Sequence, residues 1–255
     1  MSAGDGATRD WDAATYDRVC APQLQWAREQ LARVRLRGEE VVLDAGCGSG
    51  RVTELLVERV PRGRVYAVDA APSMVALAVR RLRGRATVLS QDLVELALPE
   101  PVDLVFSNAT FHWIADHDAL FSALARAMRP GARLVAQCGG RGNIERFRAA
   151  ARQVAGEPPF APSFAGWREP WNYATAQETE RRLRAAGFER VRCWLSERPA
   201  TPPEPREFVR AVCLAPALEA LPQSLRESFL ERVLKRLGEP PVLDYVRLNI
   251  AATRL

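Results

Sequence analysis

The chain has 255 residues, of which 47% are hydrophobic and 26% are charged, with 16 glycines and 18 prolines. This composition is that of an ordinary globular protein, and it excludes a disordered tail protein, a collagen and a small disulfide scaffold. The net charge is +5, but Lys235 is the only lysine among 36 basic residues, and the arginines stand beside glutamates in helix-like segments. Because a nucleic-acid groove needs a concentrated basic stripe, we interpret them as solvated helix surfaces and expect no nucleic-acid partner.

Several features bear on where the protein resides. No stretch approaches the ~20 apolar residues that a membrane span needs, so we expect no membrane association. The N-terminal residues 1–10 are polar and no apolar segment follows them, which argues against a signal peptide. The five cysteines are scattered and odd in number, as expected of reduced thiols in the cytoplasm.

The first half of the chain alternates short apolar runs with helical patterns. The runs typical of buried strands lie at residues 41–44, 65–69, 87–90, 102–106 and 133–137. Amphipathic helical patterns separate them at residues 51–59, 72–84 and 116–128, the last with Asp116 or Asp118 as its cap. This alternation predicts a parallel sheet that is covered by helices on both faces.

Polar residues stand where these strands end. Ligands of such sheets bind outside the carboxyl ends of the strands. The polar residues at these ends are Asp44, Asp69, Asp92 and Asn108. We therefore expect one binding site at this edge of the sheet.

The second half has a different character. Residues 143–172 are rich in proline and aromatic residues. After them the sequence predicts a helix at 175–186, a strand at 189–196, helices at 206–213 and 223–237, and a last strand at 245–252. We interpret residues 200–242 as a helical insertion between the last two strands of the sheet.

Residues 41–50, with the sequence VVLDAGCGSG, place glycines at 46, 48 and 50 in the turn from a strand into a helix. Without Cβ atoms there, a ligand can lie against the backbone and the helix N-terminus. A dinucleotide-binding turn is the competing interpretation, but Arg51 stands where that fingerprint needs a small residue. Asp44 would also repel a pyrophosphate, whereas it can accept hydrogen bonds from an ammonium group. The loop therefore favours a ligand with a cationic amino-acid part.

The glycine loop, the preceding Asp44 and the strand-ending Asp69 resemble the class I S-adenosylmethionine-dependent methyltransferases, over residues from about Trp11 to Gly142. The resemblance implies S-adenosylmethionine as the cofactor and S-adenosylhomocysteine as its product. It also implies a Rossmann-like, mostly parallel seven-stranded sheet with helices on both faces and a helical cap insertion. The implied cofactor-binding residues are Trp11, Tyr16, Asp44, Ala45, Gly46, Cys47, Gly48, Gly50, Asp69, Ala70, Met74, Gln91, Asp92, Leu93, Asn108 and Ala109.

The resemblance implies that different residues bind different parts of the cofactor. The glycine loop and Asp44 would hold the methionine part, and Asp69 would bind both ribose hydroxyls. Around the adenine, the implied contacts are packing by Met74, an amino-group contact to Asp92 and a ring-nitrogen contact to the Leu93 N–H. Asn108 would lie beneath the sulfonium, and the Trp11–Tyr16 segment would close over the cofactor.

Two further segments resemble the trans-aconitate methyltransferase-like subgroup: residues 107–113, SNATFHW, and residues 139–143, GGRGN. Because substrates vary widely within it, the resemblance places the chain in the subgroup and leaves the acceptor open. We take His112, Trp113, Arg141, Trp167 and Trp171 as candidate acceptor-binding residues, and His112 as the candidate catalytic residue.

The domain organisation follows from these assignments. We expect residues 1–142 to form the cofactor-binding core with N-terminal cap helices. Residues 143–172 would form an aromatic and proline-rich cap segment. Residues 173–199 and 243–255 would complete the core, and residues 200–242 would form the cap insertion.

Several cofactor candidates have a second interpretation. Asp69 can instead cap the helix that starts at Pro72, and Asp92 can form a turn. Met74 also lies at the helical spacing of a core residue. Cys47 is interpreted as a small packing residue rather than an activated thiolate.

The acceptor candidates are also open to two interpretations. His112 can act as a general base or only pack beside the cofactor. His117 is interpreted as a surface residue at a helix start. Arg141 can clamp a carboxylate or form a surface ion pair. The aromatic residues at 160–173 can form the wall of the acceptor pocket or the small core of the cap.

The sequence therefore predicts an enzyme that transfers the methyl group of S-adenosylmethionine to an oxygen or carbon of a small molecule. The alternatives are a non-methylating reaction on the same fold, such as a cyclisation, and a non-catalytic binding module. Two histidines without a C-x-x-C pair predict no metal site. The oligomeric state, monomer or dimer, stays open.

Overall fold

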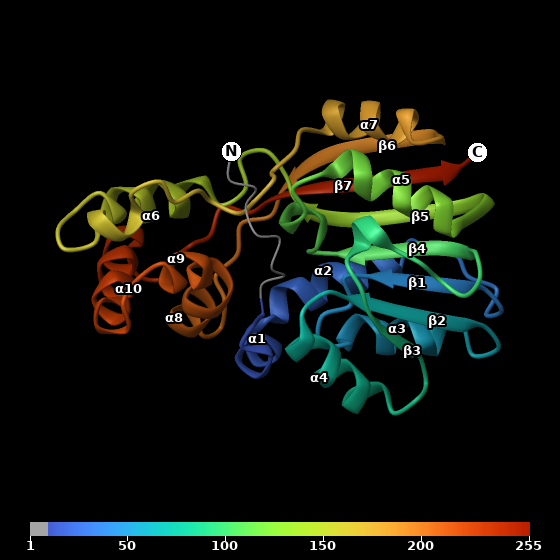
Figure 1. The fold of residues 1–255 in the computed structure, drawn as a ribbon, viewed down its shortest axis with the longest axis horizontal. Coiled ribbons are helices and arrows are strands. Elements are labelled where there is room, and N and C mark those ends of the chain that lie inside the picture. Colours follow the sequence, from blue (N-terminus) through green and yellow to red (C-terminus); the bar gives the residue numbers. More distant parts are fainter. Residues whose placement is uncertain (1–9) are drawn as a thin grey trace.

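The computed structural model describes residues 10–255, so the expectation about a signal peptide falls almost entirely outside the described part. These residues form a seven-stranded sheet with the strand order β3-β2-β1-β4-β5-β7-β6 (Figure 1). The strands are β1 (Val41–Ala45), β2 (Arg64–Asp69), β3 (Thr87–Ser90), β4 (Val102–Asn108), β5 (Met128–Gly139), β6 (Phe188–Glu197) and β7 (Val246–Arg254). Only β7 runs antiparallel to its neighbours, β5 and β6. The expected fold class is confirmed.

The helices alternate with the strands through the core. They are α1 (Ala13–Val19), α2 (Ala21–Leu31), α3 (Arg51–Arg59), α4 (Pro72–Leu82), α5 (His117–Ala127), α6 (Glu145–Ala155), α7 (Ala176–Ala185), α8 (Pro205–Phe208), α9 (Ala215–Glu219) and α10 (Gln223–Leu237). Short 3₁₀ helices form η1 (Leu93–Glu95), η2 (Phe111–Trp113) and η3 (Ala161–Phe164), and a π-helical turn forms η4 (Val209–Cys213). Asp116 caps α5 by accepting a hydrogen bond from the Ala119 N–H at 2.8 Å, as the sequence predicts.

Alternate residues of each central strand pack on opposite faces of the sheet, because side chains point to opposite sides along a strand. Leu43 of β1 joins a buried cluster with Phe121 of α5 and Leu183 of α7. Its neighbour Val42 packs with Leu31 of α2 and Leu56 of α3 on the other face. Both faces are therefore covered, and the edge at the carboxyl ends of the parallel strands remains available for a site.

Two connections leave from those carboxyl ends and form a helical lobe, which lies to the left of the sheet in Figure 1. The first carries α6 and η3 between β5 and α7, and the second carries α8, η4, α9 and α10 between β6 and β7. They share a buried core that includes Phe147, Phe160 and Phe229. We call this lobe the cap.

The structure differs from the sequence-based expectations at three places. Residues 143–172 contain the helix α6, which we did not predict. The single helix expected at 206–213 is instead one turn of α-helix followed by the π-helical turn η4. Strand β5 begins at Met128 rather than near 133, with a register shift against β4 where Pro130 and Gly131 intervene. Proline lacks an N–H for the ladder and Gly131 has φ +80°, so the chain bulges there.

Candidate functional site

The glycine loop is held against the end of β2 by its own backbone. The Gly46 and Cys47 N–H groups both donate to the Val68 carbonyl oxygen, at 2.8 and 2.9 Å. The Gly48 N–H donates to Asp69 Oδ2 at 2.8 Å, and Asp69 Oδ1 accepts from the Ala71 N–H at 2.9 Å. Asp69 therefore fixes the loop, and it is not the cap of α4, whose N-cap residue is Ala71.

Two glycines of the loop are required for different reasons. A Cβ at Gly46 (φ +80°) would lie 2.1 Å from Thr110 Oγ1, so this glycine permits a close approach within the protein. A Cβ at Gly48 (φ +52°) would meet no protein atom within 4 Å. Both backbone conformations favour glycine, but only at Gly48 does the Cβ position face open space that a ligand can enter.

Asp44 is a buried carboxyl group without a cationic partner among the described residues. Its side chain is 1% exposed and accepts a hydrogen bond from Thr53 Oγ1 at 2.7 Å. Burial raises the pKa of Asp44 to about 7, and the nearby charge of Asp69 adds to the rise. Burial also raises the pKa of Asp69. Two carboxyl groups with raised pKa values favour a cationic ligand, because a positive charge stabilises their ionised forms.

The loop borders a cavity of about 60 Å³, which we call the glycine-loop cavity. Its lining combines predicted residues with residues of α2 and α3, namely Tyr16, Cys20, Gln23, Leu24, Asp44, Gly46, Cys47, Gly48, Ser49, Arg51, Val52 and Asn108. Asn108 Nδ2 donates to the Gln23 carbonyl at 3.1 Å, whereas its buried Oδ1 has no partner. The cavity thus presents unpaired acceptors beside the loop, whereas the cation in its lining, Arg51, is paired with Asp17.

Helix α1 lies over this cavity. The carboxylate of Asp17 accepts hydrogen bonds from Ser49 Oγ and from both guanidinium groups of Arg51 and Arg81. Close to these contacts of Asp17, Trp11 and Tyr16 pack with the buried Met74. Arg81 also donates to the Ser49 carbonyl at 2.7 Å, which ties α1, α4 and the glycine loop together.

The residues after β3 lie at the same edge. Asp92 is exposed and caps η1 by accepting from the Val94 N–H at 3.0 Å, which is the turn-forming role considered above. Gln91 exchanges hydrogen bonds with the backbone of Ala97, and Leu93 is buried. A contact of these three residues with an adenine ring stays a prediction.

A second, smaller pocket of about 30 Å³ lies between the sheet and the cap, and we call it the His112 pocket. Its lining residues come from both parts of the molecule: Tyr16, Gln23, Ala109, His112, Trp113, Asn143, Ile144, Trp171, Tyr173, Val212, Cys213, Tyr245 and Arg247. Tyr16 and Gln23 line the glycine-loop cavity as well, so the two spaces are adjacent. A group held in one can therefore meet a group held in the other.

His112 is 7% exposed, and its Nδ1 accepts a hydrogen bond from the Gly139 N–H at 3.3 Å. Burial holds the pKa of His112 well below its usual range, and the positive charge of Arg247 lowers it further. The ring is therefore neutral near pH 7. Because Nδ1 accepts, this hydrogen-bond pattern assigns the proton to Nε2.

Arg247 is the unexpected residue of the pocket. It is 2% exposed, and no described carboxylate lies within ion-pair distance of it. Its Nε donates to Gln137 Oε1 at a long 3.4 Å, and its guanidinium lies over Trp26, 4.7 Å from the ring centroid. One terminal nitrogen is buried without a hydrogen-bond partner. An unpaired buried cation is costly, so this group is suited to an anion.

The remaining candidates lie in different places. Trp171 lines the His112 pocket, and Trp167 lines a separate cavity in the cap. Arg141 is exposed and lines none of these spaces, so no geometry supports its role as a carboxylate clamp. The interpretation of His117 as a surface residue is wrong: the ring is 3% exposed because it turns inward to the Phe111 carbonyl oxygen, 2.9 Å from Nε2.

Comparison with known proteins places this geometry in a family. Residues 42–131 match the model of a methyltransferase domain. Over 96% of this chain and 98% of the relative, the sequence is 35% identical to a trans-aconitate 2-methyltransferase of Methylobacterium nodulans. The chain belongs to the trans-aconitate 2-methyltransferase family. It is an S-adenosylmethionine-dependent methyltransferase that acts on a small molecule.

Solved structures agree on the fold. This methyltransferase matches a phosphoethanolamine N-methyltransferase 2 of Haemonchus contortus in complex with S-adenosylhomocysteine at TM-score 0.63 and 19% identity, covering 95% of this chain and 56% of that one. The cyclase SpnF matches at TM-score 0.60 and 18% identity, over 91% and 81% of the two chains. Because the same fold is found in a cyclase, the fold alone does not distinguish methyl transfer from cyclisation. The trans-aconitate 2-methyltransferase of Methylobacterium nodulans, which matches over nearly its whole length, favours methyl transfer.

The residues of the glycine-loop cavity fit this methyl donor. Gly48 leaves open space beside the loop, and the buried carboxyl group of Asp44 would suit the ammonium of the methionine part. The unpaired Asn108 Oδ1 adds a further buried acceptor. When bound, the cofactor supplies an electrophilic methyl group on a sulfonium sulfur.

The cap and β7 contribute residues to the His112 pocket that were not predicted from the sequence. The missed lining residues include Tyr173, Cys213, Tyr245 and Arg247. A signal for Arg247 was present, since Arg247 and Asn249 share one face of a strand that is otherwise apolar. A charged residue within such a strand indicates a functional or paired site.

Proposed function

We propose that this methyltransferase acts on a carboxylate oxygen of its acceptor, which it holds through Arg247. The supporting observation is the unpaired, buried guanidinium in the His112 pocket, next to the cavity of the glycine loop. A charge-assisted, bidentate contact with a carboxylate would satisfy this group. The name of the relative makes trans-aconitate the first acceptor to test.

The residues around this pocket suit the reaction. A carboxylate needs no general base, so the neutral His112 would donate from Nε2–H and orient the acceptor. The aromatic walls, including Trp113, Trp171 and Tyr173, exclude water. Water exclusion favours a reaction in which an anion and a sulfonium cation neutralise each other.

The proposal assigns the cofactor contacts as well. Asp44 and the glycine loop would bind the methionine part, Asp69 and Ala70 the ribose end, and Trp11, Tyr16 and Met74 the outer face. The five free thiols support the further proposal that the enzyme works in the reducing cytoplasm. Among residues 10–255, no helix is both long and apolar enough to span a membrane.

A pair of arginine variants tests the anchor. We expect Arg247→Gln to raise the KM for the acceptor about 10- to 100-fold, because a hydrogen-bonded buried charge contributes roughly 1.5–3 kcal/mol. Arg141→Gln is the matched control, and we expect its kinetics to equal those of the wild type. The assay follows methyl-ester formation from trans-aconitate and other carboxylic acids by mass spectrometry. Methylation on carbon, or a loss confined to Arg141→Gln, would overturn the proposal.

A further inference from the structure

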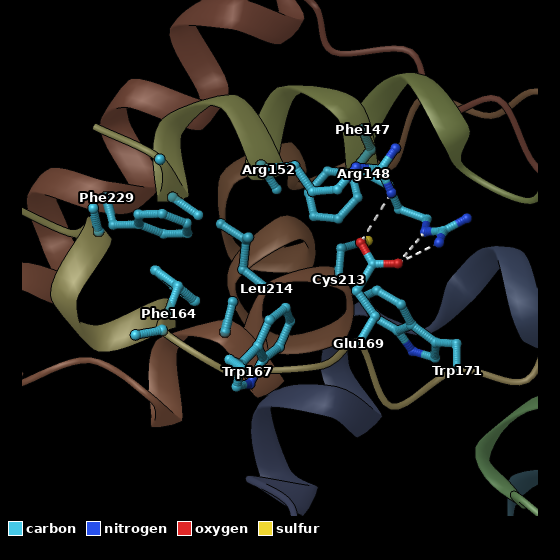
Figure 2. Close-up of a pocket in the computed structure, with 16 residues that line it drawn as sticks. Phe147, Arg148, Arg152, Phe164, Trp167, Glu169, Trp171, Cys213, Leu214 and Phe229 are labelled. Carbon is cyan, nitrogen blue, oxygen red and sulfur yellow. Dashed lines mark hydrogen bonds and ion pairs between the residues drawn. The ribbon is translucent and has the colours of Figure 1, made fainter.

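The cap contains a cavity of about 300 Å³, which is larger than the glycine-loop cavity and the His112 pocket (Figure 2). It lies between α6, η3, η4, α9 and α10, and its walls are mainly aromatic and aliphatic. Phe147, Phe164, Trp167, Leu214 and Phe229 surround it in Figure 2. A volume of this size lies within the range of small-molecule pockets and holds about ten water-sized groups. We call it the cap cavity.

The cap cavity and the His112 pocket share a wall. Trp171 and Cys213 line both spaces. The Trp171 ring stacks on Tyr173 at 5.8 Å between centroids, and Tyr173 stacks on His112 at 5.7 Å. A row of rings therefore leads from the cap cavity to the pocket that contains Arg247.

The charges at the rim of the cap cavity are already paired. Arg148 Nε donates to Glu169 Oε2 at 2.8 Å, and Arg152 pairs with both Glu145 and Glu169. Figure 2 shows the carboxylate of Glu169 turned toward Arg148 and Arg152. No described cation at this rim is left for an anionic ligand. The two adjacent spaces thus offer one unpaired positive charge, at Arg247, and one large apolar volume.

We propose that the acceptor is an amphipathic monocarboxylic acid. This inference rests on the function proposed above, and it extends that function by naming the class of acceptor. The carboxylate would bind at Arg247, and the aliphatic or aromatic body would pass Trp171 and Cys213 into the cap cavity. One carboxylate oxygen forms the new bond to the methyl carbon, the electron pair of the broken carbon–sulfur bond stays on sulfur, and no proton is released.

A tricarboxylate such as trans-aconitate fits these spaces poorly. Two of its three carboxylates would lack an unpaired cation in the lining of these two spaces, and burying them without a partner is costly. A monocarboxylic acid brings one charge to one guanidinium. Its apolar body is then stabilised by the removal of its surface from water.

The test compares acids of different length on the wild type. We expect kcat/KM for decanoate to exceed that for butanoate by at least tenfold, and trans-aconitate to be a poorer acceptor than decanoate. Ala151→Phe, which fills the cap cavity from α6, should lower the ratio of kcat/KM for decanoate over butanoate at least tenfold. Ala149→Phe is the matched control on the same helix, because Ala149 does not line the cavity, and it should keep the wild-type ratio.

A second variant keeps the test decisive if Ala151→Phe does not fold. Phe164→Ala enlarges the cap cavity and should shift the preferred acceptor to longer acids. Unchanged chain-length preferences in the folded variants, or a preference for trans-aconitate, would overturn this inference while leaving carboxylate methylation intact. If no acid is methylated, or if Arg247→Gln methylates acids as well as the wild type, the proposed function itself fails.

Discussion

Asp44 is predicted to make cofactor binding dependent on pH. Burial raises the pKa of this carboxyl group to about 7, so the free enzyme holds a proton there below pH 7. If Asp44 binds the ammonium group of the ligand, that positive charge favours the ionised carboxylate, and binding then releases the proton. We expect the affinity for S-adenosylmethionine to rise about tenfold per pH unit up to pH 7 and to level off above it.

Titration calorimetry between pH 5.5 and 7.5 measures this dependence. Asp44→Asn should bind more weakly and with a flat profile, because the amide does not titrate. A wild-type affinity that is constant over this range would show that Asp44 does not contact the ammonium.

His112 is predicted to donate a hydrogen bond rather than to remove a proton. Its pKa lies well below the usual value, so the ring stays neutral throughout the neutral pH range. We expect kcat with a carboxylate acceptor to be constant from pH 6 to 8. We also expect His112→Ala to lower kcat/KM only about 3- to 10-fold, as for loss of a neutral hydrogen bond.

His112→Gln, which keeps an N–H donor, should recover part of this loss. A general base would behave differently, since its removal costs about 10²- to 10⁴-fold and its ionisation appears in the pH profile. Steady-state kinetics of the two variants therefore distinguish the two roles.

The residues of this site were predictable to different degrees. Asp44, Asp69 and Asn108 could be placed together because the carboxyl ends of parallel strands meet at one edge of a sheet. Arg247 could not be placed, because the alternating pattern of a strand does not reveal its direction. Since β7 is antiparallel, the beginning of this strand, not its end, reaches the site.

Among the elements, the glycine loop offers a matched pair of substitutions. Gly46→Ala would push a Cβ into Thr110 and should destabilise the fold, lowering Tm clearly. Gly48→Ala shares the strain of a positive φ but meets no protein atom. We expect the Tm of Gly48→Ala to fall less than that of Gly46→Ala, and its affinity for S-adenosylmethionine to fall more. Differential scanning calorimetry and calorimetric titration check the pair, and equal effects of both changes would contradict the assignment of Gly48 to the ligand side.

Helix α1 is predicted to cover the glycine-loop cavity and to be held there by the contacts of Asp17. Asp17 joins it to Arg51 and Arg81, and these contacts hold the pKa of Asp17 well below its usual range. Asp17→Asn should weaken these ion pairs. The backbone amides of residues 13–19 should then exchange hydrogen faster, while those of β1 keep their protection. Unchanged exchange in this helix would show that its other contacts, such as the packing of Trp11 and Tyr16 and the Arg18–Glu204 ion pair, are enough to hold it in place.

Other elements show where sequence patterns succeed and fail. The helix α6 was open to prediction, since Phe147, Ala150 and Val154 recur at helical spacing, but the prolines around it obscured that pattern. The π-helical turn η4 was not, because the tertiary packing of the cap overrides the local preference for a regular helix. The core strands were the most predictable elements, since they are continuous apolar runs covered on both faces.

At the scale of the whole molecule, the two proposed tasks fall on different parts of the chain. The residues proposed to bind the cofactor come from the segment 11–16, from α4, and from the ends of strands β1 to β4 with the loops that follow them. The proposed acceptor space is built largely by the cap and β7. Substitutions in the cap cavity should therefore change acceptor preference and leave cofactor affinity unaltered.

The position of β7, which is last in the chain but lies between β5 and β6 in the sheet, has a consequence for how the enzyme is assembled on the ribosome. Every residue proposed to bind S-adenosylmethionine precedes residue 110 in the sequence, whereas Arg247 is translated more than a hundred residues later. A nascent chain can thus assemble the donor half before the anchor for the acceptor exists. Methylation has to wait until the last strand inserts between β5 and β6, so synthesis itself orders the two halves of the site in time.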